Sequence, residues 1–255
     1  MYLAIDIGGT KTLIALFSDS GRVVKKIKFK TARGFKRFSE DLLLNLQPFA
    51  RRKIACVVVA IPGIVQNNCS VRFGNRDWGE VNIIAIVKKL FSCPIYQEND
   101  ANLATIYESK DLSGKTIFLT FSTGIGGGIA LDGKLDNLES SKFEPGHIIY
   151  DYDGIRQEWE DFASAKAIEN LFHVDVATGL RGIYRMREIG RRIGLGLEDI
   201  VNKYEPDTII IGGPLGKIFR RFVGFLPKLN VKYRRPRRPL ESVIYGCYIL
   251  GKNQK

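Results

Sequence analysis

The sequence lacks the features that would assign it to a secreted, disulfide-bonded or membrane-spanning class. Its cysteines form no C-x-x-C pair and are scattered along the chain as Cys56, Cys69, Cys93 and Cys247. This pattern predicts free thiols in a reducing compartment. The longest apolar run, residues 54–65, contains Pro62 and Gly63 and is too short to span a bilayer. Met1 leads directly into a strand with no basic leader region, so we expect a cytoplasmic protein that does not contact membranes.

Acidic residues are few relative to basic ones. The chain has 255 residues, with 39 Lys and Arg against 27 Asp and Glu, and a formal net charge of +12. Such an excess suits nucleic acid or a polyanionic substrate. However, no zinc-finger spacing, RNA-recognition motif or helix-turn-helix is recognisable, so nucleic acid is not the expected partner. The densest basic run, residues 232–238, is predicted to be a surface loop, and the excess charge also attracts phosphate-bearing metabolites.

The pattern of apolar runs and turns predicts an α/β protein with two related lobes. In the first part we expect strands at 3–7, 12–17, 22–29, 54–60 and 95–98, and helices near 37–50 and 80–91. In the second part we expect strands at 116–121, 129–131 and 207–211, a hairpin at Asp132-Gly133, and helices near 158–171, 182–204, 215–227 and 241–251. Both parts begin as strand, glycine-rich turn and strand. Two lobes with a cleft between them, lined by both glycine turns, would follow from this repeat.

The segment at residues 3–12 is the first candidate site. An apolar run containing Asp6 ends at Gly8-Gly9, and Thr10 and Lys11 follow before a second apolar run begins. Two strands joined by a glycine turn expose backbone N–H groups that an anion can accept. The neighbouring hydroxyl and amine can donate to a phosphate tail, and Asp6 can hold its magnesium ion. A tight hairpin with a buried strand and no ligand is an equally good interpretation of these residues alone.

The second candidate is the segment Glu98-Asn99-Asp100-Ala101-Asn102, which follows a strand and opens a helical pattern. Asn and Asp at this place are ordinary N-cap residues, and that interpretation is favoured by the segment alone. In the functional alternative, the helix dipole keeps Asp100 ionised at the edge of the cleft. An ionised carboxylate there could accept a proton from a substrate hydroxyl during phosphoryl transfer.

Three further loops carry polar groups. Glu144-Pro145-Gly146-His147 presents two side chains on a stiff loop suited to a polyol, although solvated loop residues are more common. Glu160 and Asp161 begin a helical run, where acidic residues need no functional reason. Residues 75–78 form a polar loop ending in Trp78, which is predicted either to lie in the core or to contact a carbohydrate edge.

The order of these segments is more specific than any one of them. After the hairpin come Ile61-Pro62-Gly63, residues 75–78, Glu98 to Asn102, the run Ser122-Thr123-Gly124-Ile125-Gly126-Gly127-Gly128, the 144–147 loop, residues 160–164 and Ile211-Gly212-Gly213. This series resembles the ROK family of repressors and sugar kinases, within the actin-like superfamily. The resemblance covers nearly the whole chain. It implies a two-lobed actin-like ATPase (ribonuclease H-like) fold, with residues 1–110 and 241–255 in one lobe and 111–240 in the other.

The resemblance also implies a set of functional residues. The ATP-binding set is Asp6, Gly8, Gly9, Thr10, Lys11, Thr123, Gly124, Gly126, Gly127, Gly212 and Gly213, with Asp6 orienting Mg²⁺ through water. The sugar-binding set is Asn75, Asn99, Asp100, Glu144, His147 and Glu160. Asp100 would be the general base. A homodimer is an assembly that the family allows.

One departure from the family concerns zinc. Many members bind zinc through the histidine of the E-x-G-H loop and a C-x-C-G-x-x-G-C run that follows it. Here residues 150–157 contain no cysteine. One histidine cannot complete a tetrahedral site of nitrogen and sulfur ligands, so we predict no structural zinc. The segment between His147 and Glu160 is then expected to be held by packing, for example of Tyr150 and Trp159. Because this segment departs from the family pattern, fewer matching residues support the assignment of Glu160.

The expected activity is ATP-dependent phosphorylation of a hexose at its 6-hydroxyl, as in a glucokinase. A fructokinase or an N-acylhexosamine kinase is an alternative, since selectivity depends on a few pocket contacts. A polyphosphate-dependent glucokinase is another, with the 234–238 run contacting the long donor. An inactive sugar-responsive regulatory protein is the alternative from a different class. No DNA-binding helices are expected before the segment at residues 3–12, which argues against the repressor branch of the family.

Overall fold

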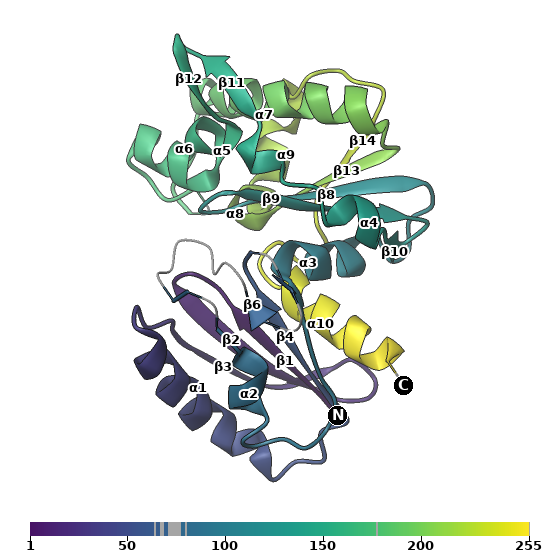
Figure 1. Cartoon of the computed structure of the whole chain (residues 1–255). Coiled ribbons are helices and arrows are strands. Elements are labelled where there is room, and N and C mark those ends of the chain that lie inside the picture. The colour runs from purple at the N-terminus through teal and green to yellow at the C-terminus, as the bar shows by residue number, and fades with distance from the viewer. Residues whose placement is uncertain (64, 67–68, 71–77, 80, 177, 255) are drawn as a thin grey trace. The chain divides into compact units, whose positions relative to one another are not determined.

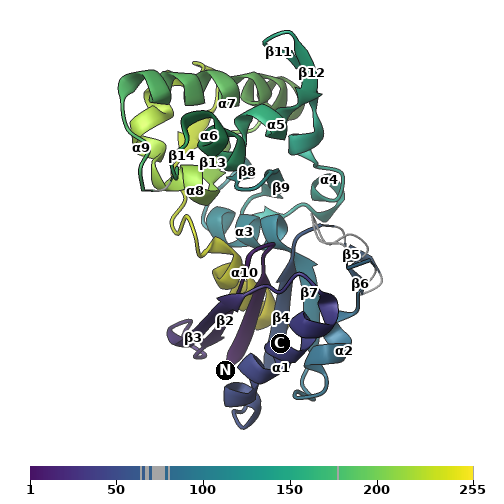
Figure 2. The ribbon, with the colours of Figure 1, turned by 90° about the vertical axis from the view of Figure 1, so that its left-hand side faces the viewer.

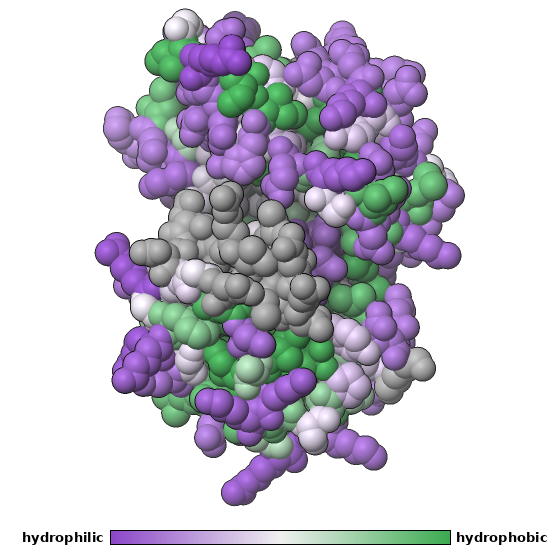
Figure 3. Space-filling view, viewed as in Figure 1, coloured by the Kyte–Doolittle hydropathy of each residue, from purple (hydrophilic) through white to green (hydrophobic). Residues whose placement is uncertain are grey.

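The computed structural model describes residues 1–63, 65–66, 69–70, 78–79, 81–176 and 178–254. The chain forms two compact units (Figure 1). Unit 1 comprises residues 1–107 and 243–255, and unit 2 comprises residues 108–242. Hydrophilic side chains are spread over both units on the face that Figure 3 shows. None of the helices in the described part of the chain combines the length and apolar character that crossing a membrane requires.

The sheet of unit 1 has five strands in the order β3-β2-β1-β4-β7. Their bounds are β1 Tyr2–Ile7, β2 Lys11–Phe17, β3 Val23–Lys30, β4 Cys56–Ile61 and β7 Ile95–Asn99. β1, β2 and β3 pair antiparallel, whereas β4 and β7 continue the sheet parallel to β1. All six residues of β4 are buried, which confirms the predicted central strand. A short hairpin, β5 Val65–Gln66 and β6 Cys69–Ser70, follows β4.

Two hydrophobic clusters hold the helices of unit 1 on its sheet. On one face, α1 (Phe35–Ala50) and α2 (Ile83–Val87) pack against β1 and β4 through Phe38, Leu42 and Ile83. On the other face, α3 (Asp100–Ser109) and α10 (Ser242–Asn253) contribute Leu103 and Ile244. The helix predicted near 80–91 is shorter than expected, and the chain continues as a turn after α2.

Unit 2 repeats this strand order. Its sheet runs β10-β9-β8-β13-β14, with bounds β8 Lys115–Phe121, β9 Ile125–Leu131, β10 Lys134–Leu135, β13 Thr208–Gly212 and β14 Lys232–Arg234. As in unit 1, three antiparallel strands are followed by two parallel ones. The similarity between the two halves of the sequence therefore reflects a repeated topology. The remaining strands, β11 (Ile149–Tyr152) and β12 (Ile155–Glu158), form a separate hairpin that was not predicted.

The second glycine run is mostly strand rather than turn. Only residues 122–124 connect the strands, and Gly126 and Gly127 lie in β9, where they pair with Thr120 and Leu119. A Cβ atom on Gly127 would collide with the ring of Phe143, so the glycine permits close packing and does not mark a loop. This corrects the predicted extent of the turn.

Three other predictions of local structure need correction. The helix predicted at 158–171 is two helices, α5 (Trp159–Ala163) and α6 (Ala165–Phe172). Ser164 separates them because its backbone is extended and its hydroxyl caps α6. The helix predicted at 215–227 is likewise broken into α8 (Gly213–Lys217), α9 (Phe219–Phe222) and a 3₁₀ turn at Val223–Phe225. The predicted loop at 232–238 begins with β14, which pairs with β13.

The core of unit 2 lies on one face of its sheet. The long helix α7 (Ile183–Tyr204) packs there together with α5, and the fully buried Trp159 lies between them. A Cβ atom on Gly196 would overlap the Trp159 indole, so this glycine lets α7 approach closely. The predicted packing role of Trp159 is confirmed. Its indole N–H also donates to the carbonyl oxygen of Arg192 at 3.0 Å. The short elements α4 (Asn137–Ser140) and η1 (Pro145–His147) connect the β9–β10 region to the β11–β12 hairpin.

Candidate functional site

The first candidate site lies at the carboxyl edge of the unit 1 sheet. β1, β4 and β7 run parallel, so their ends bring together the turn at residues 8–10, the 61–63 segment and the start of α3. In open α/β sheets, ligands bind outside the carboxyl ends of the strands. The turn is held closed because the Gly8 N–H donates to the Lys11 carbonyl oxygen at 3.0 Å. The Thr31 hydroxyl also donates to the Gly8 carbonyl oxygen at 2.8 Å.

Asp6 and Asp100 interact electrostatically within unit 1. The pKa of Asp6 is raised to about 7, first by burial and next by the negative charge of Asp100, while Lys28 acts in the opposite direction. A divalent cation would relieve the cost of ionising a buried carboxylate beside a second one. The residues present therefore fit Mg²⁺, with Asp6 as the group that would hold it.

The start of α3 divides two roles between neighbouring residues. The Asn99 amide oxygen accepts from the N–H groups of Ala101 and Asn102 at 2.8 and 3.1 Å, as an N-cap does. The amide nitrogen of Asn99 donates to the Gly63 carbonyl oxygen at 3.0 Å. Asp100 also accepts from the Ala101 N–H, at 2.8 Å. The capping role considered for Asp100 therefore belongs chiefly to Asn99, whose amide nitrogen uses one of its two hydrogens in the bond to Gly63.

In unit 2, both predicted glycine turns lie at the ends of neighbouring parallel strands. The 122–124 turn follows β8. Gly212 is the last residue of β13, the strand paired with β8, and Gly213 begins α8. The turn is closed by a hydrogen bond from the Ser122 N–H to the Gly124 carbonyl oxygen at 2.8 Å. Gly213 has a φ of +67°, and a Cβ atom there would collide with the backbone of Phe121. The structure thus packs Gly213 against the backbone of Phe121, the residue that directly precedes the 122–124 turn.

Glu160 joins the second glycine turn to the E-P-G-H loop. Its carboxylate accepts from the Ile125 N–H at 3.0 Å. A Cβ atom added to Gly124 or to Gly146 would collide with the same carboxylate. Two glycines from separate segments are therefore needed for Glu160 to lie between them. This contact shows that three of the sequence-predicted segments meet in unit 2.

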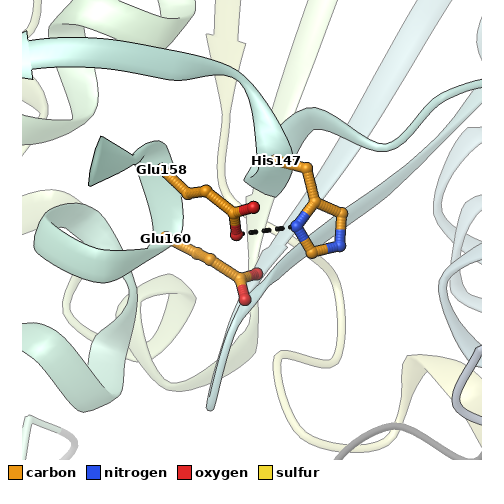
Figure 4. Close-up of side chains that lie close together, drawn as sticks. All are labelled: His147, Glu158 and Glu160. Carbon is orange, nitrogen blue, oxygen red and sulfur yellow. Dashed lines mark hydrogen bonds and ion pairs between the residues drawn. The ribbon is translucent and has the colours of Figure 1, made fainter. Parts of the chain in front are cut away.

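His147 has a partner that the sequence analysis missed. Its Nδ1 atom lies 2.8 Å from the carboxylate of Glu158, at the end of β12 (Figure 4). This hydrogen bond raises the pKa of His147 above its usual value, helped by the charges of Glu158, Glu160 and Glu144 and opposed by partial burial. Glu158 also forms a capping box with Asp161 at the start of α5. The spacing of these two acids was the available signal for that helix start.

His147, Glu158 and Glu160 offer ligand atoms that lie within 4.8 Å of one another. The three side chains point toward one another in Figure 4. An imidazole and two carboxylates are a donor set that suits a divalent metal ion. The sequence-based expectation of no structural zinc stays a prediction.

Two further sequence predictions have different outcomes. Asn75 lies outside the described residues. Trp78 is 8% exposed and packs against Phe38 with ring centroids 4.6 Å apart, which supports a core position for this residue. Among the remaining predicted sugar contacts, Glu144 is exposed and lies beside η1.

The two sheets of identical strand order, with glycine turns at the carboxyl ends of their parallel strands, define an α/β fold of the actin-like ATPase type. The chain belongs to the ROK family, whose model matches residues 2–223.

Three known proteins illustrate the range of its relatives. A glucokinase of Streptomyces coelicolor is 27% identical over 259 residues, covering 84% of this chain and 81% of that protein. A xylose repressor of Bacillus spizizenii is 24% identical over 178 residues, covering 60% of this chain and 46% of the repressor. This chain therefore spans less than half of that repressor. An inorganic polyphosphate/ATP-glucomannokinase of Arthrobacter has the same fold, with a TM-score of 0.80 and 22% identity over 100% of this chain and 99% of that one.

Proposed function

We propose that this protein is a sugar kinase that transfers a phosphoryl group from ATP to the 6-hydroxyl of a hexose. The observation that carries the proposal is the coupled pair of carboxylates, Asp6 and Asp100, beside the glycine turn of unit 1. Membership of a family that includes glucokinases supports it. Cys56, Cys93 and Cys247 are free thiols, in keeping with a cytoplasmic enzyme.

In this proposal Asp100 is the general base. Its carboxylate accepts the proton of the sugar hydroxyl as the hydroxyl oxygen bonds to the transferred phosphorus atom. The N-terminus of α3 favours the ionised form, and Asn99 holds that terminus in place. Mg²⁺ near Asp6 would neutralise charge on the phosphate oxygens. The turn at Gly8 and Gly9 would lie against those oxygens, and the Thr10 hydroxyl and the Lys11 ammonium would donate to them.

Residues of unit 2 also have proposed roles in binding. The turn containing Thr123 and Gly124 would bind phosphate, and Gly212-Gly213 would lie against the adenosine. Glu144, His147 and Glu160 would bind sugar hydroxyls, since a carboxylate accepts and an imidazole can donate or accept hydrogen bonds. The contact of Glu160 with the Ile125 N–H supports a link between the sugar-binding and phosphate-binding segments. The oligomeric state stays a prediction.

The test is a coupled assay of ADP release over a panel of sugars, including glucose, mannose, fructose and N-acetylmannosamine. We expect turnover with at least one hexose, and the panel separates a glucokinase from a fructokinase or an N-acylhexosamine kinase. With polyphosphate, which releases no ADP, the sugar phosphate is measured directly. Failure of every sugar with both ATP and polyphosphate would remove the kinase proposal and favour the sugar-responsive regulatory alternative.

The Asp100→Ala variant tests the proposed base. We expect kcat to fall by about 10²- to 10⁴-fold, because a general base contributes on that order. Sugar binding, measured by calorimetry, should persist. Glu40→Ala, at an exposed position on α1, is the matched control and should keep kcat within about twofold. Turnover by Asp100→Ala at the level of this control would assign the base to another group.

A further inference from the structure

The open end of the β11–β12 hairpin holds an imidazole and a carboxylate together. Glu158 is the last residue of β12 and pairs with Ile149, the first residue of β11. Beyond this pair, the Trp159 N–H donates to the Ile148 carbonyl oxygen at 2.8 Å. His147 is the next residue along the chain from Ile148, and its Nδ1 atom lies 2.8 Å from the Glu158 carboxylate. The side-chain contact therefore continues the backbone pairing of the hairpin.

The start of α5 fixes the backbone that carries the Glu158 side chain. The Asp161 carboxylate accepts from the Glu158 N–H at 3.1 Å, as part of the capping box (Figure 2 shows α5 beside the hairpin). The next residue, Trp159, is fully buried, and its indole holds the carbonyl oxygen of Arg192. Glu158 is thus attached to the core of unit 2 through its immediate neighbours.

The turn η1 fixes the backbone of His147. The His147 N–H donates to the Glu144 carbonyl oxygen at 3.3 Å. The preceding residue, Gly146, is buried, and a Cβ atom there would collide with the Ile125 carbonyl oxygen and the Glu160 carboxylate. The imidazole is therefore carried by a packed turn, and both partners of the contact have defined positions.

The two ring nitrogens of His147 have different surroundings. Nδ1 faces Glu158, whereas Nε2 lies on the side of the ring away from that carboxylate (Figure 4). Within the part of the chain that the structure describes, no residue forms a hydrogen bond with Nε2, and the side chain is exposed. Nε2 is therefore the nitrogen with which His147 would contact a ligand.

The partner of one imidazole nitrogen decides what the other nitrogen can do. An ionised carboxylate has only acceptor atoms, so the 2.8 Å contact with Glu158 requires the hydrogen of the neutral ring to be on Nδ1. Nε2 then carries a lone pair and accepts a hydrogen bond. Without this carboxylate the hydrogen is free to occupy Nε2, which would turn that atom into a donor.

We propose that Glu158 is a positioning residue that holds the neutral His147 ring in its Nδ1–H tautomer, so that Nε2 accepts a hydrogen bond from a sugar hydroxyl. The contact with sugar rests on the proposed function of this site, whereas the choice of tautomer does not.

This tautomer has a consequence for substrate selection. Glu144 and Glu160 are also proposed to bind sugar hydroxyls, and their ionised carboxylates only accept hydrogen bonds. With Nε2 of His147 as a third acceptor, this part of the site binds groups that donate a hydrogen. It therefore selects a hydroxyl over a fluoro or methoxy substituent at the same position, because the substituent would leave the acceptor unpaired.

Nitrogen NMR of the histidine rings tests the tautomer without any measurement of activity. The chain contains two histidines, His147 and His173, so a sample with isotope-labelled histidine gives two ring patterns, which His173→Gln assigns. Spectra are recorded near pH 9, because the hydrogen bond to Glu158 raises the pKa of His147. We expect the hydrogen on Nδ1 in His147. The exposed His173 is the internal reference and should carry its hydrogen on Nε2, as solvated imidazole side chains favour.

The variant Glu158→Gln removes the charge and keeps the length of the side chain. Its amide offers Nδ1 both an acceptor and a donor, so His147 should lose its preference for one tautomer. Asp151→Asn is the matched control, because it removes one negative charge from an exposed position on β11 of the same hairpin. In this control His147 should keep its hydrogen on Nδ1. The wild-type spectrum decides the tautomer even if the Glu158 variant fails to fold.

Steady-state kinetics at the same pH test the contact with sugar. For Glu158→Gln we expect the sugar KM to rise about tenfold and kcat to stay within about threefold, as for an interaction made equally in the ground and transition states. Deoxyfluoro analogues, one for each hydroxyl that is not phosphorylated, give a second readout. At one position, the ratio of kcat/KM for the sugar to that for its analogue should fall about tenfold in Glu158→Gln, because an Nε2–H group no longer requires a donor. Asp151→Asn should leave this ratio unchanged.

Three results would overturn the proposal. A wild-type His147 ring without a hydrogen on Nδ1 would show that Glu158 does not select the tautomer. Loss of the tautomer in Asp151→Asn as well would assign the effect to the charge of the hairpin. An unchanged KM and an unchanged discrimination against every fluoro analogue in Glu158→Gln would show that Nε2 does not accept from the sugar. Absence of turnover with every sugar would reject the proposed function, while the spectra would still decide the role of Glu158 on the ring.

Discussion

At the scale of single residues, Asp6 combines a position in the candidate site with a cost in stability. It lies on a central strand, where burial and the neighbouring Asp100 disfavour its charged form. A pKa of about 7, against 3.8 for an ordinary aspartate, means that the folded protein retains a proton that the unfolded chain releases. The free energy of unfolding therefore declines as the pH rises from about 4 to 7.

The variant Asp6→Asn should remove this decline. Without Mg²⁺ we expect it to be more stable than the wild type at pH 8 by a few kcal/mol, since each pKa unit corresponds to about 1.4 kcal/mol. Near pH 4 the difference should be small, because Asp6 is protonated in the folded state and about half protonated in the unfolded chain, whose aspartate has a pKa of 3.8. Urea denaturation at the two pH values measures the difference. Parallel pH dependences for the wild type and the variant would show that Asp6 is not the titrating group.

Kinase activity gives the complementary readout for Asp6. Loss of the carboxylate should weaken the dependence of turnover on Mg²⁺ concentration, because the amide is a poorer ligand for a hard cation. Stability and activity would then move in opposite directions, as is common for functional carboxylates held in unfavourable surroundings.

At the scale of elements, the β11–β12 hairpin links the E-P-G-H loop to α5. Tyr152 stacks on Phe162 with ring centroids 4.1 Å apart, and Tyr150 donates to Asp199 of α7 at 2.6 Å. The hairpin ends at Glu158, which binds His147. Ring packing and the hydrogen bonds of Tyr150 and His147 thus hold this segment.

The His147–Glu158 pair should make stability depend on pH. Because Glu158 raises the pKa of His147, the pair stabilises the folded state below pH about 6.5, and this contribution disappears as the pH rises through the raised pKa. The His147 side chain is 57% exposed, so we expect less than about 1 kcal/mol. Thermal unfolding of the wild type and Glu158→Gln should differ at pH 5.5 and coincide at pH 8.5. A difference that is constant with pH would point to packing instead.

Metal content is the second prediction for this element. With no cysteine between His147 and Glu160, we expect the purified protein to contain no stoichiometric zinc by elemental analysis. One equivalent of zinc that is lost in Glu158→Gln would instead show that the imidazole and two carboxylates form a metal site.

At the scale of the whole molecule, the chain leaves unit 1 and returns to it for its last helix. α10 buries Ile244 and Cys247 completely or nearly so, and Gly246 lies against the backbone of Leu103. Tyr248 also stacks on Phe17 of β2. Segments from the two ends of the sequence therefore share one hydrophobic cluster.

Removal of residues 243–255 should destabilise unit 1 selectively. Each fully buried apolar side chain contributes roughly 1.5–3 kcal/mol, so the loss of several should exceed about 3 kcal/mol. Hydrogen exchange should show lost protection in β1 and β2 and retained protection in β8 and β13. Removal of residues 254–255 alone is the matched control. Equal loss of protection in both units would indicate that they unfold as one.

Local chemistry is why much of this protein could be predicted from the sequence. The turn at Gly8-Gly9, the helix start at Asn99 and the apolar run of β4 each depend on neighbours a few residues away. The repeated order of strands and turns could be predicted because each strand and turn likewise depends on nearby residues. Predictions from residue propensity were wrong at two places where packing or capping decides. Gly127 lies in a strand, where the absence of a side chain leaves room for the Phe143 ring, and Ser164 divides a predicted helix in two.

The chemistry of the candidate site depends on contacts that residue spacing does not encode. Asp6 and Asp100 interact because the sheet places β1 and β7 on either side of β4, with their carboxyl ends at the same edge. This strand order is a property of the folded sheet. Glu160 meets the Ile125 N–H, and Lys30 meets Lys11, through packing and pairing across the chain. Sequence patterns report short-range preferences, whereas burial and charge coupling act through space. The sequence therefore identified the candidate side chains, and the tertiary structure determined their partners and, for Asp6, the direction of the pKa shift.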